Sequence, residues 1–114
     1  MTVLKSLDEK LYMRSLVTEI INGESYSYYP LGQYVVRAMG VCGDRPTFKY
    51  TRIEIAGVME RLAKGENVEN IVLGFRGRVS REALAEAIQV VTTHFLESLP
   101  ISILHNEFLH ESLK

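Results

Sequence analysis

The chain has 114 residues, 46% of them hydrophobic and 24% charged, and its formal net charge is -1. These values are ordinary for a soluble globular domain, and they exclude a protein whose overall charge alone draws it to nucleic acid. The single cysteine, Cys42, cannot form an internal disulfide, and no apolar run reaches the roughly eighteen residues that a membrane helix needs. Because charged residues interrupt positions 1–16, we expect no signal peptide and a cytoplasmic protein.

Residues 3–22 have the apolar spacing of an amphipathic helix. The apolar positions are Leu7, Leu11, Met13, Leu16, Val17, Ile20 and Ile21. Asn22 and Gly23 follow, and we interpret them as the helix stop, because both residue types tolerate the left-handed conformation. A face this broad must be buried on the domain or on another chain, so we expect a homodimer.

Residues 25–39 change to the composition of β-strands. Tyr26, Tyr28 and Tyr29 are interleaved with serines, residues 34–39 form a second strand, and residues 30–33 form the turn of a hairpin. A short third strand is expected at residues 48–50. Tyrosines in such a cluster pack a small sheet, stack on bases or line the groove of a partner, and packing is the commoner role.

A first helical pattern covers residues 52–64, with one apolar stripe. The stripe consists of Ile55, Val58, Met59 and Leu62. Thr51 and Glu54 have the spacing of a capping box, with Tyr50 and Ile55 as the hydrophobic staple around it. Gly65 is expected to end the helix in the left-handed conformation.

Two further helical patterns follow a short connection. The second, residues 68–75, is too short to be stable without packing, and the third begins at a Ser80 N-cap and ends at about residue 99, before Pro100. The expected inward positions are Val68, Ile71, Val72 and Phe75 in the second helix and Leu84, Ala87, Ile88, Val91 and Phe95 in the third. Residues 76–79 are the turn between them, so the order is that of a helix-turn-helix with a supporting helix in front.

These patterns predict a mainly α protein, with a trihelical helix-turn-helix core, an N-terminal helix and a small β-hairpin. The expected organisation is an N-terminal extension at residues 1–33 that contains a helix and the first strand, a core domain at residues 34–99, and a C-terminal tail at residues 100–114. The same three-helix pattern also occurs in packing units that never touch DNA.

Charge is unevenly distributed along the chain. Residues 34–81 carry nine basic and five acidic side chains, a net charge of +4, whereas residues 82–114 carry one basic and five acidic side chains, a net charge of -4. The DNA-binding candidates are Arg76, Arg78, Ser80, Arg81 and Gln89. Glu82 and Glu86 are expected on the same outward face, where they would oppose DNA unless one of them accepts from a cytosine amino group. Alternatively, the arginines form a solvated turn that pairs with those glutamates.

No arrangement of residue types indicates an enzyme. A nucleophilic Cys42 would need a base, but His94, His105 and His110 belong to no catalytic motif, and the thiol fits a small buried side chain. The same residues lack the spacing of a zinc set, and the glycines match no phosphate-binding or dinucleotide fingerprint. We therefore expect no catalytic residue, no metal and no cofactor.

About half of the chain resembles the domain of unknown function family 433, short proteins interpreted as antitoxin-like, VapB-type partners of PIN-domain ribonuclease toxins. The resemblance rests on residues 42–47, 49–53, 62–66 and 80–88, and its motif positions are Gly43, Arg45, Pro46, Thr51, Arg52 and Gly65. The family usually has glycine at the position of Tyr50, proline at that of Glu54, and a tyrosine-proline turn at residues 75–78.

The resemblance implies a small regulator that blocks the active site of a PIN-type ribonuclease and binds its own promoter as a dimer. Apart from the resemblance, residues 4–21 and 101–113 offer apolar surface that could wrap around a protein partner. The alternative function is a dimeric protein-interaction adaptor that binds no nucleic acid.

Overall fold

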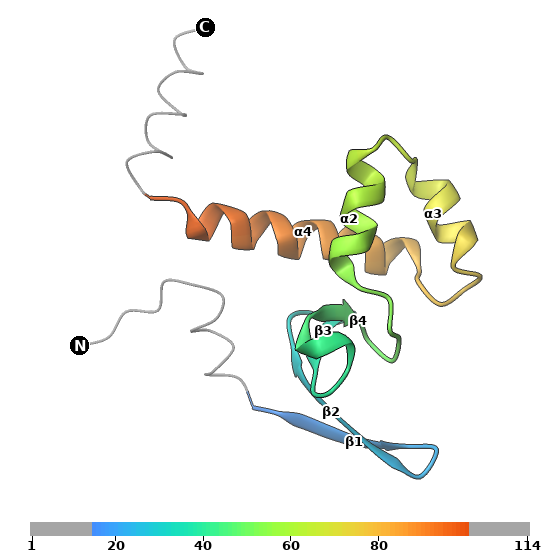
Figure 1. Cartoon of the computed structure of the whole chain (residues 1–114), viewed down its shortest axis with the longest axis vertical. Coiled ribbons are helices and arrows are strands. Elements are labelled where there is room, and N and C mark those ends of the chain that lie inside the picture. Colours follow the sequence, from blue (N-terminus) through green and yellow to red (C-terminus); the bar gives the residue numbers. More distant parts are fainter. Residues whose placement is uncertain (1–14, 101–114) are drawn as a thin grey trace, which may run out of the picture.

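The computed structural model describes residues 15–100, which form one four-stranded antiparallel sheet and three helices (Figure 1). This is an α+β arrangement, so the prediction of a mainly α protein is wrong. The three helices predicted for the core are present in the predicted order. The sheet is larger than expected because a strand forms where the end of the N-terminal helix was predicted.

The predicted helix at residues 3–22 is the main error. Its first part, residues 3–14, lies outside the described residues, and its last part is strand β1 (Val17–Ile21), which pairs antiparallel with β2 (Glu24–Pro30). Asn22 and Gly23 have φ angles of 52° and 81°, so they make the two-residue turn of a β-hairpin and not a helix stop. The β-branched residues in β1 favour the extended conformation.

The strands follow one another across the sheet in the order β1-β2-β3-β4. The predicted hairpin is confirmed, because β2 pairs with β3 (Val35–Ala38), with Tyr28 opposite Ala38. The predicted third strand is β4 (Pro46–Phe48), slightly earlier than expected. The expected boundary between extension and core, after residue 33, lies in the connection between the paired strands β2 and β3.

Helix α2 (Ile55–Ala63) ends as predicted but begins differently. Gly65 has a φ of 97°, and its amide and that of Glu66 bond back to the carbonyls of Leu62 and Arg61, which closes the helix in a Schellman motif. The predicted capping box is wrong, because the N-cap is Glu54 and no side chain caps the helix. The Tyr50 side chain is 55% exposed and serves as no staple.

Thr51 closes a turn before the helix instead. Its hydroxyl donates to the carbonyl of Phe48 at 2.8 Å and accepts from the amide of Ile53 at 3.0 Å. Such local bonds of a threonine side chain compete with a helix cap.

Helices α3 (Val68–Gly74) and α4 (Arg81–Ser98) both begin at a side-chain cap. The Asn67 side chain accepts from the amide of Asn70 at 2.8 Å, and the Ser80 hydroxyl accepts from the amide of Ala83 at 3.0 Å. The predicted Ser80 cap is therefore confirmed. None of the helices within residues 15–100 is long and apolar enough to cross a membrane.

The main core lies between the sheet and the three helices. Its largest fully buried members are Val35, Phe48, Val58, Ile71, Val79 and Leu84. A second cluster of Tyr28, Val36 and Ala38 lies on the alternate strand positions. The first half of α4 contributes to the core as predicted, through Leu84 and Ala87.

The second half of α4 does not pack as predicted. Ile88 and Val91 are each 38% exposed and Phe95 is 58% exposed. The reason is that α4 runs beyond α2 and α3, so these elements cover only its first half (Figure 1).

Candidate nucleic-acid interface

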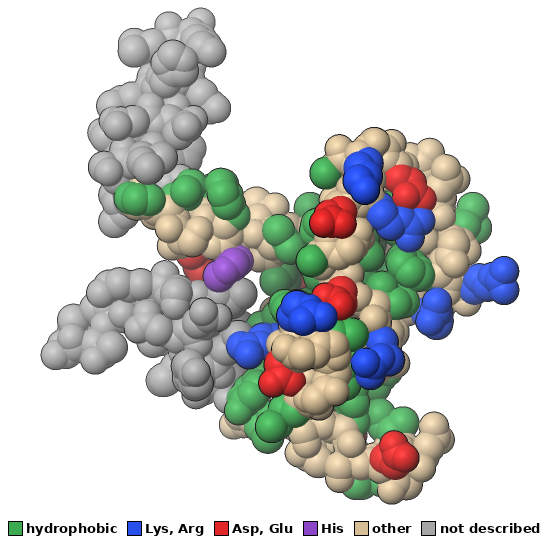
Figure 2. All heavy atoms as spheres, in the orientation of Figure 1, with side chains coloured by type: hydrophobic (Ala, Val, Ile, Leu, Met, Phe, Trp, Pro, Cys, Tyr) green, Lys and Arg blue, Asp and Glu red, His purple; other side chains and the backbone are tan. Residues whose placement is uncertain are grey.

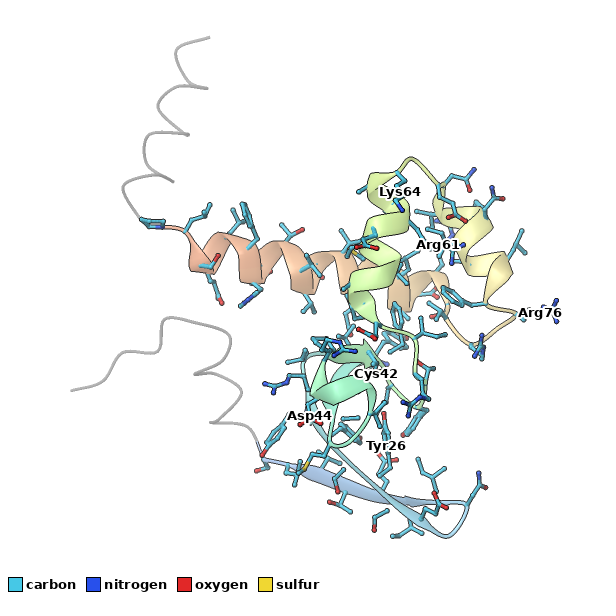
Figure 3. All side chains as sticks on the ribbon, viewed as in Figure 1. Tyr26, Cys42, Asp44, Arg61, Lys64 and Arg76 are labelled. Carbon is cyan, nitrogen blue, oxygen red and sulfur yellow. The ribbon has the colours of Figure 1, made fainter. Side chains whose placement is uncertain are left out.

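The α3–α4 turn, residues 75–80, carries two of the predicted DNA-binding residues. Arg76 and Gly77 have φ angles of 54° and 86°, so the chain reverses direction just after α3. Arg76 and Arg78 are exposed, and neither forms an ion pair with another described residue. Arg76 points away from the fold (Figure 3), on an edge where several cationic side chains project (Figure 2).

The start of α4 carries two further candidates, and the structure already uses both side chains. The Ser80 hydroxyl caps the helix, as described above. The Arg81 guanidinium forms an ion pair with Glu69 of α3, and both side chains are more than half exposed. An exposed pair of this kind contributes little to stability, so its arginine can exchange one acidic partner for another.

Glu86 does not face outward as predicted. Its carboxylate turns towards the sheet and accepts three backbone hydrogen bonds, from the amides of Gln33 at 2.8 Å, Tyr34 at 2.7 Å and Val35 at 3.0 Å. The carboxylate also fills the space beside Gly32, where an added Cβ would lie 2.4 Å from the Glu86 Oε2 atom. Glu86 therefore attaches α4 to the start of β3, a role that sequence reasoning missed.

With Glu86 turned inward, the outward surface at the start of α4 is less acidic than predicted. Arg81, Ala85 and Gln89 are exposed and lie four residues apart, so they share one side of the helix, which we call the exposed α4 face. Two acidic side chains remain beside it, Glu82 and the Glu69 that pairs with Arg81. The small Ala85 side chain between Arg81 and Gln89 allows a ligand to approach this face closely.

Apart from Gly65 at the end of α2, the family-motif residues lie in β4 or in the segments on either side of it. Gly43, with a φ of 63°, lies in the 3-10 turn at Cys42–Asp44, and Pro46 begins β4. Arg45 forms a two-point ion pair with Glu54 at 2.8 and 3.1 Å, and this bond holds the pKa of the Glu54 carboxyl below its usual value. Arg52 is exposed and forms no ion pair with any residue in the described range 15–100.

A network of tyrosines and one carboxylate lies beside this connection. Glu19 of β1 accepts from the hydroxyls of Tyr28 and Tyr50, the latter at 2.7 Å. Both hydrogen bonds lower the pKa of Glu19. Burial, together with the hydrogen bond to Glu19, raises the pKa of Tyr28 to about 12. The Lys49 ammonium lies 5.1 Å from the centre of the Tyr28 ring and 5.3 Å from that of Tyr50. Of the predicted cluster, Tyr28 is buried, and Tyr26 and Tyr29 pack partly buried against the two core clusters, which agrees with a packing role.

The described residues offer little for catalysis or metal binding. No group of three His, Cys, Asp or Glu side chains within residues 15–100 is placed to hold a metal ion. The Cys42 thiol donates to the carbonyl of Arg52 at 3.4 Å, and His94 is exposed on α4. His105 and His110 lie outside the described residues.

The fold and this surface define a small α+β domain in which a cationic turn leads into a capped helix of 18 residues. Residues 35–89 match the model of the DUF433 family, which is described as a protein of unknown function. The match extends from β3 into α4 and includes the α3–α4 turn, so the expected resemblance to this family is confirmed over that segment. No significant match was found among curated proteins or solved structures.

Proposed function

We propose that the protein is an antitoxin-like regulator that binds duplex DNA, including its own promoter, and binds a PIN-type ribonuclease as its protein partner. The DNA would be contacted by the α3–α4 turn and the exposed α4 face. The part concerning the ribonuclease rests on the family resemblance in the sequence.

The inward position of Glu86 is the observation that carries the DNA-binding part. A carboxylate on the outward side of α4 would repel phosphates, but this one is occupied by three backbone amides. The outward surface then has arginines for phosphate contacts and Gln89 for a base edge. The positive end of the α4 dipole also favours phosphate at the start of this helix.

The second half of α4 supports a protein-protein contact. Ile88, Val91, Phe95 and Leu96 are all between 38% and 58% exposed. Apolar side chains grouped on one helix are typical of a surface that another chain covers. This observation supports the ribonuclease partner, a homodimer and the alternative adaptor function equally. DNA binding is the property that separates the proposed regulator from the adaptor.

The decisive experiment measures binding to a labelled duplex of about 30 base pairs from the region upstream of the gene, with a scrambled duplex for comparison. We expect the triple variant Arg76→Ala, Arg78→Ala, Arg81→Ala to bind at least about tenfold more weakly, with a shallower salt dependence. Glu82→Gln removes an acid beside the exposed α4 face and should strengthen binding.

Glu60→Gln is the matched control for Glu82→Gln, because Glu60 is exposed on α2 and forms no ion pair with a described residue. Equal binding by wild type and the triple variant would exclude the exposed α4 face as the DNA contact.

The protein partner requires a separate test. The tagged chain is purified mildly from its host after nuclease treatment, and bound proteins are identified by mass spectrometry. A stoichiometric PIN-type ribonuclease whose activity the chain inhibits would support the antitoxin function. A stable dimer alone, together with no DNA binding, would favour the adaptor.

A further inference from the structure

An open groove lies beside the start of α4. A hollow of about 870 Å³ separates the β1–β2 turn from the loop between β4 and α2, and a second of about 400 Å³ extends to Ser80. Lys49, Tyr50 and Arg78 line both hollows, so the two form one continuous surface, which we call the hairpin groove.

The hairpin groove is cationic. Lys49, Arg52 and Arg78 line it, and Glu24 is the one acidic residue among the lining side chains. Arg52 and Arg78 form no ion pair within residues 15–100, so their charge is available to a ligand. This balance favours an anion that extends along the groove and not a single buried charge.

Several polar groups of the groove have hydrogen-bond donors to offer. The Tyr26 hydroxyl accepts from the amide of Tyr50 at 2.9 Å but donates its own proton to no described residue. Figure 3 shows Tyr26 rising from the hairpin towards the rest of the fold. The Nε atom of Arg78 is bonded to the carbonyl of Phe75, which leaves its terminal nitrogens as donors. Phosphate oxygens accept hydrogen bonds and carry negative charge, so they match this lining.

We propose that the hairpin groove binds the sugar-phosphate backbone of the duplex whose bases face α4, so that the β1–β2 hairpin forms a second DNA contact. This inference rests on the proposed DNA-binding function. The groove continues into the α3–α4 turn through Arg78 and Ser80, so one backbone can pass from the helix start to the hairpin.

The test uses Arg52→Ala and its charge-preserving counterpart Arg52→Lys. Lys64→Ala is the matched control, because it removes one exposed, unpaired cation at the far end of α2 (Figure 3). Binding of the full chain to the upstream and scrambled duplexes is measured by fluorescence anisotropy over a range of salt concentrations. Gln89→Ala, on the exposed α4 face, reports on base recognition independently.

Log affinity falls as log salt rises, and loss of one phosphate contact makes this slope shallower by about one. We expect this change for Arg52→Ala, with equal weakening on both duplexes, and we expect Arg52→Lys to retain most of the wild-type slope. Lys64→Ala should leave the slope unchanged. Gln89→Ala should reduce the preference for the upstream duplex with little change in slope.

Failure of this inference is distinguishable from failure of the proposed function. If Arg52→Ala behaves like Lys64→Ala while Gln89→Ala loses preference, the groove is not a DNA contact but the exposed α4 face is. The separated strands are measured in the same assay, and tighter binding of a single strand than of the duplex would also overturn the inference. If wild type binds neither duplex, both proposals are wrong.

Discussion

Replacing Glu86 with alanine tests the attachment of α4 to the sheet. The change removes the acceptor of three backbone amides, at 2.7 to 3.0 Å. The amide of exposed Gln33 can bond to water instead, whereas Val35 is fully buried and Tyr34 is half-buried. The lost stabilisation therefore comes mainly from two of the three bonds.

Hydrogen bonds to a charged group each contribute about 1.5–3 kcal/mol, and partial exposure places this site at the low end. We expect Glu86→Ala to lower the free energy of unfolding by about 3 kcal/mol, a large part of the stability of a small domain. The measurement is urea unfolding followed by far-ultraviolet circular dichroism. Glu82→Ala is the control, because Glu82 is exposed one turn earlier on the same helix and should change stability by less than about 0.5 kcal/mol.

A double-mutant cycle makes this test specific. Gly32→Ala places a Cβ 2.4 Å from the Glu86 carboxylate, so it must displace that side chain from its three amides. The same change should cost much less in the Glu86→Ala background, with a coupling of about 1–2 kcal/mol. Equal stability of Glu86→Ala and Glu82→Ala, or additive effects in the cycle, would refute the proposed attachment.

Three further changes test other parts of the fold. Thr47 is fully buried and its hydroxyl has no hydrogen-bond partner in the described residues, so Thr47→Val should leave stability unchanged or raise it in urea unfolding. Gly65 has a φ of 97° in open space, so Gly65→Ala should destabilise by about 1 kcal/mol through strain alone. Ion pairs with arginines lower the pKa values of Glu54 and Glu66 below the ordinary 4.5. Their stabilisation is therefore complete above pH 4.5 and is lost as the pH falls through the lowered values, which thermal unfolding against pH will detect as a falling Tm.

The helices were predictable because their signals are local. Ser80 caps α4 and Gly65 ends α2 through bonds to residues a few positions away. At the end of the predicted N-terminal helix, by contrast, the local signals fit two structures. Val17, Ile20 and Ile21 satisfy the helical spacing, and Asn22-Gly23 serves equally as a helix stop or a hairpin turn. Only pairing with β2 decides between the two, and pairing is a tertiary property.

The candidate site was predictable in part. Exposed arginines in a short turn follow from the sequence, and the structure keeps Arg76 and Arg78 in solvent. The inward direction of the Glu86 side chain could not be predicted from the sequence, because its hydrogen-bond partners lie 51 to 53 residues earlier in the chain. A helical repeat assigns Glu86 and Glu82 to one side, but amides at the start of β3 draw only Glu86 inward.

This attachment also constrains how the proposed contacts work together. Glu86 bonds the first half of α4 to β3, and β3 pairs with β2 of the hairpin, so one hydrogen-bonded unit carries both the exposed α4 face and the hairpin groove. The apolar second half of the same helix extends away from that unit. A protein partner bound there would leave the DNA contacts uncovered while adding its own charge next to them. If the proposed ribonuclease binds there, we expect it to change DNA affinity through electrostatics and not by masking the arginines of the α3–α4 turn.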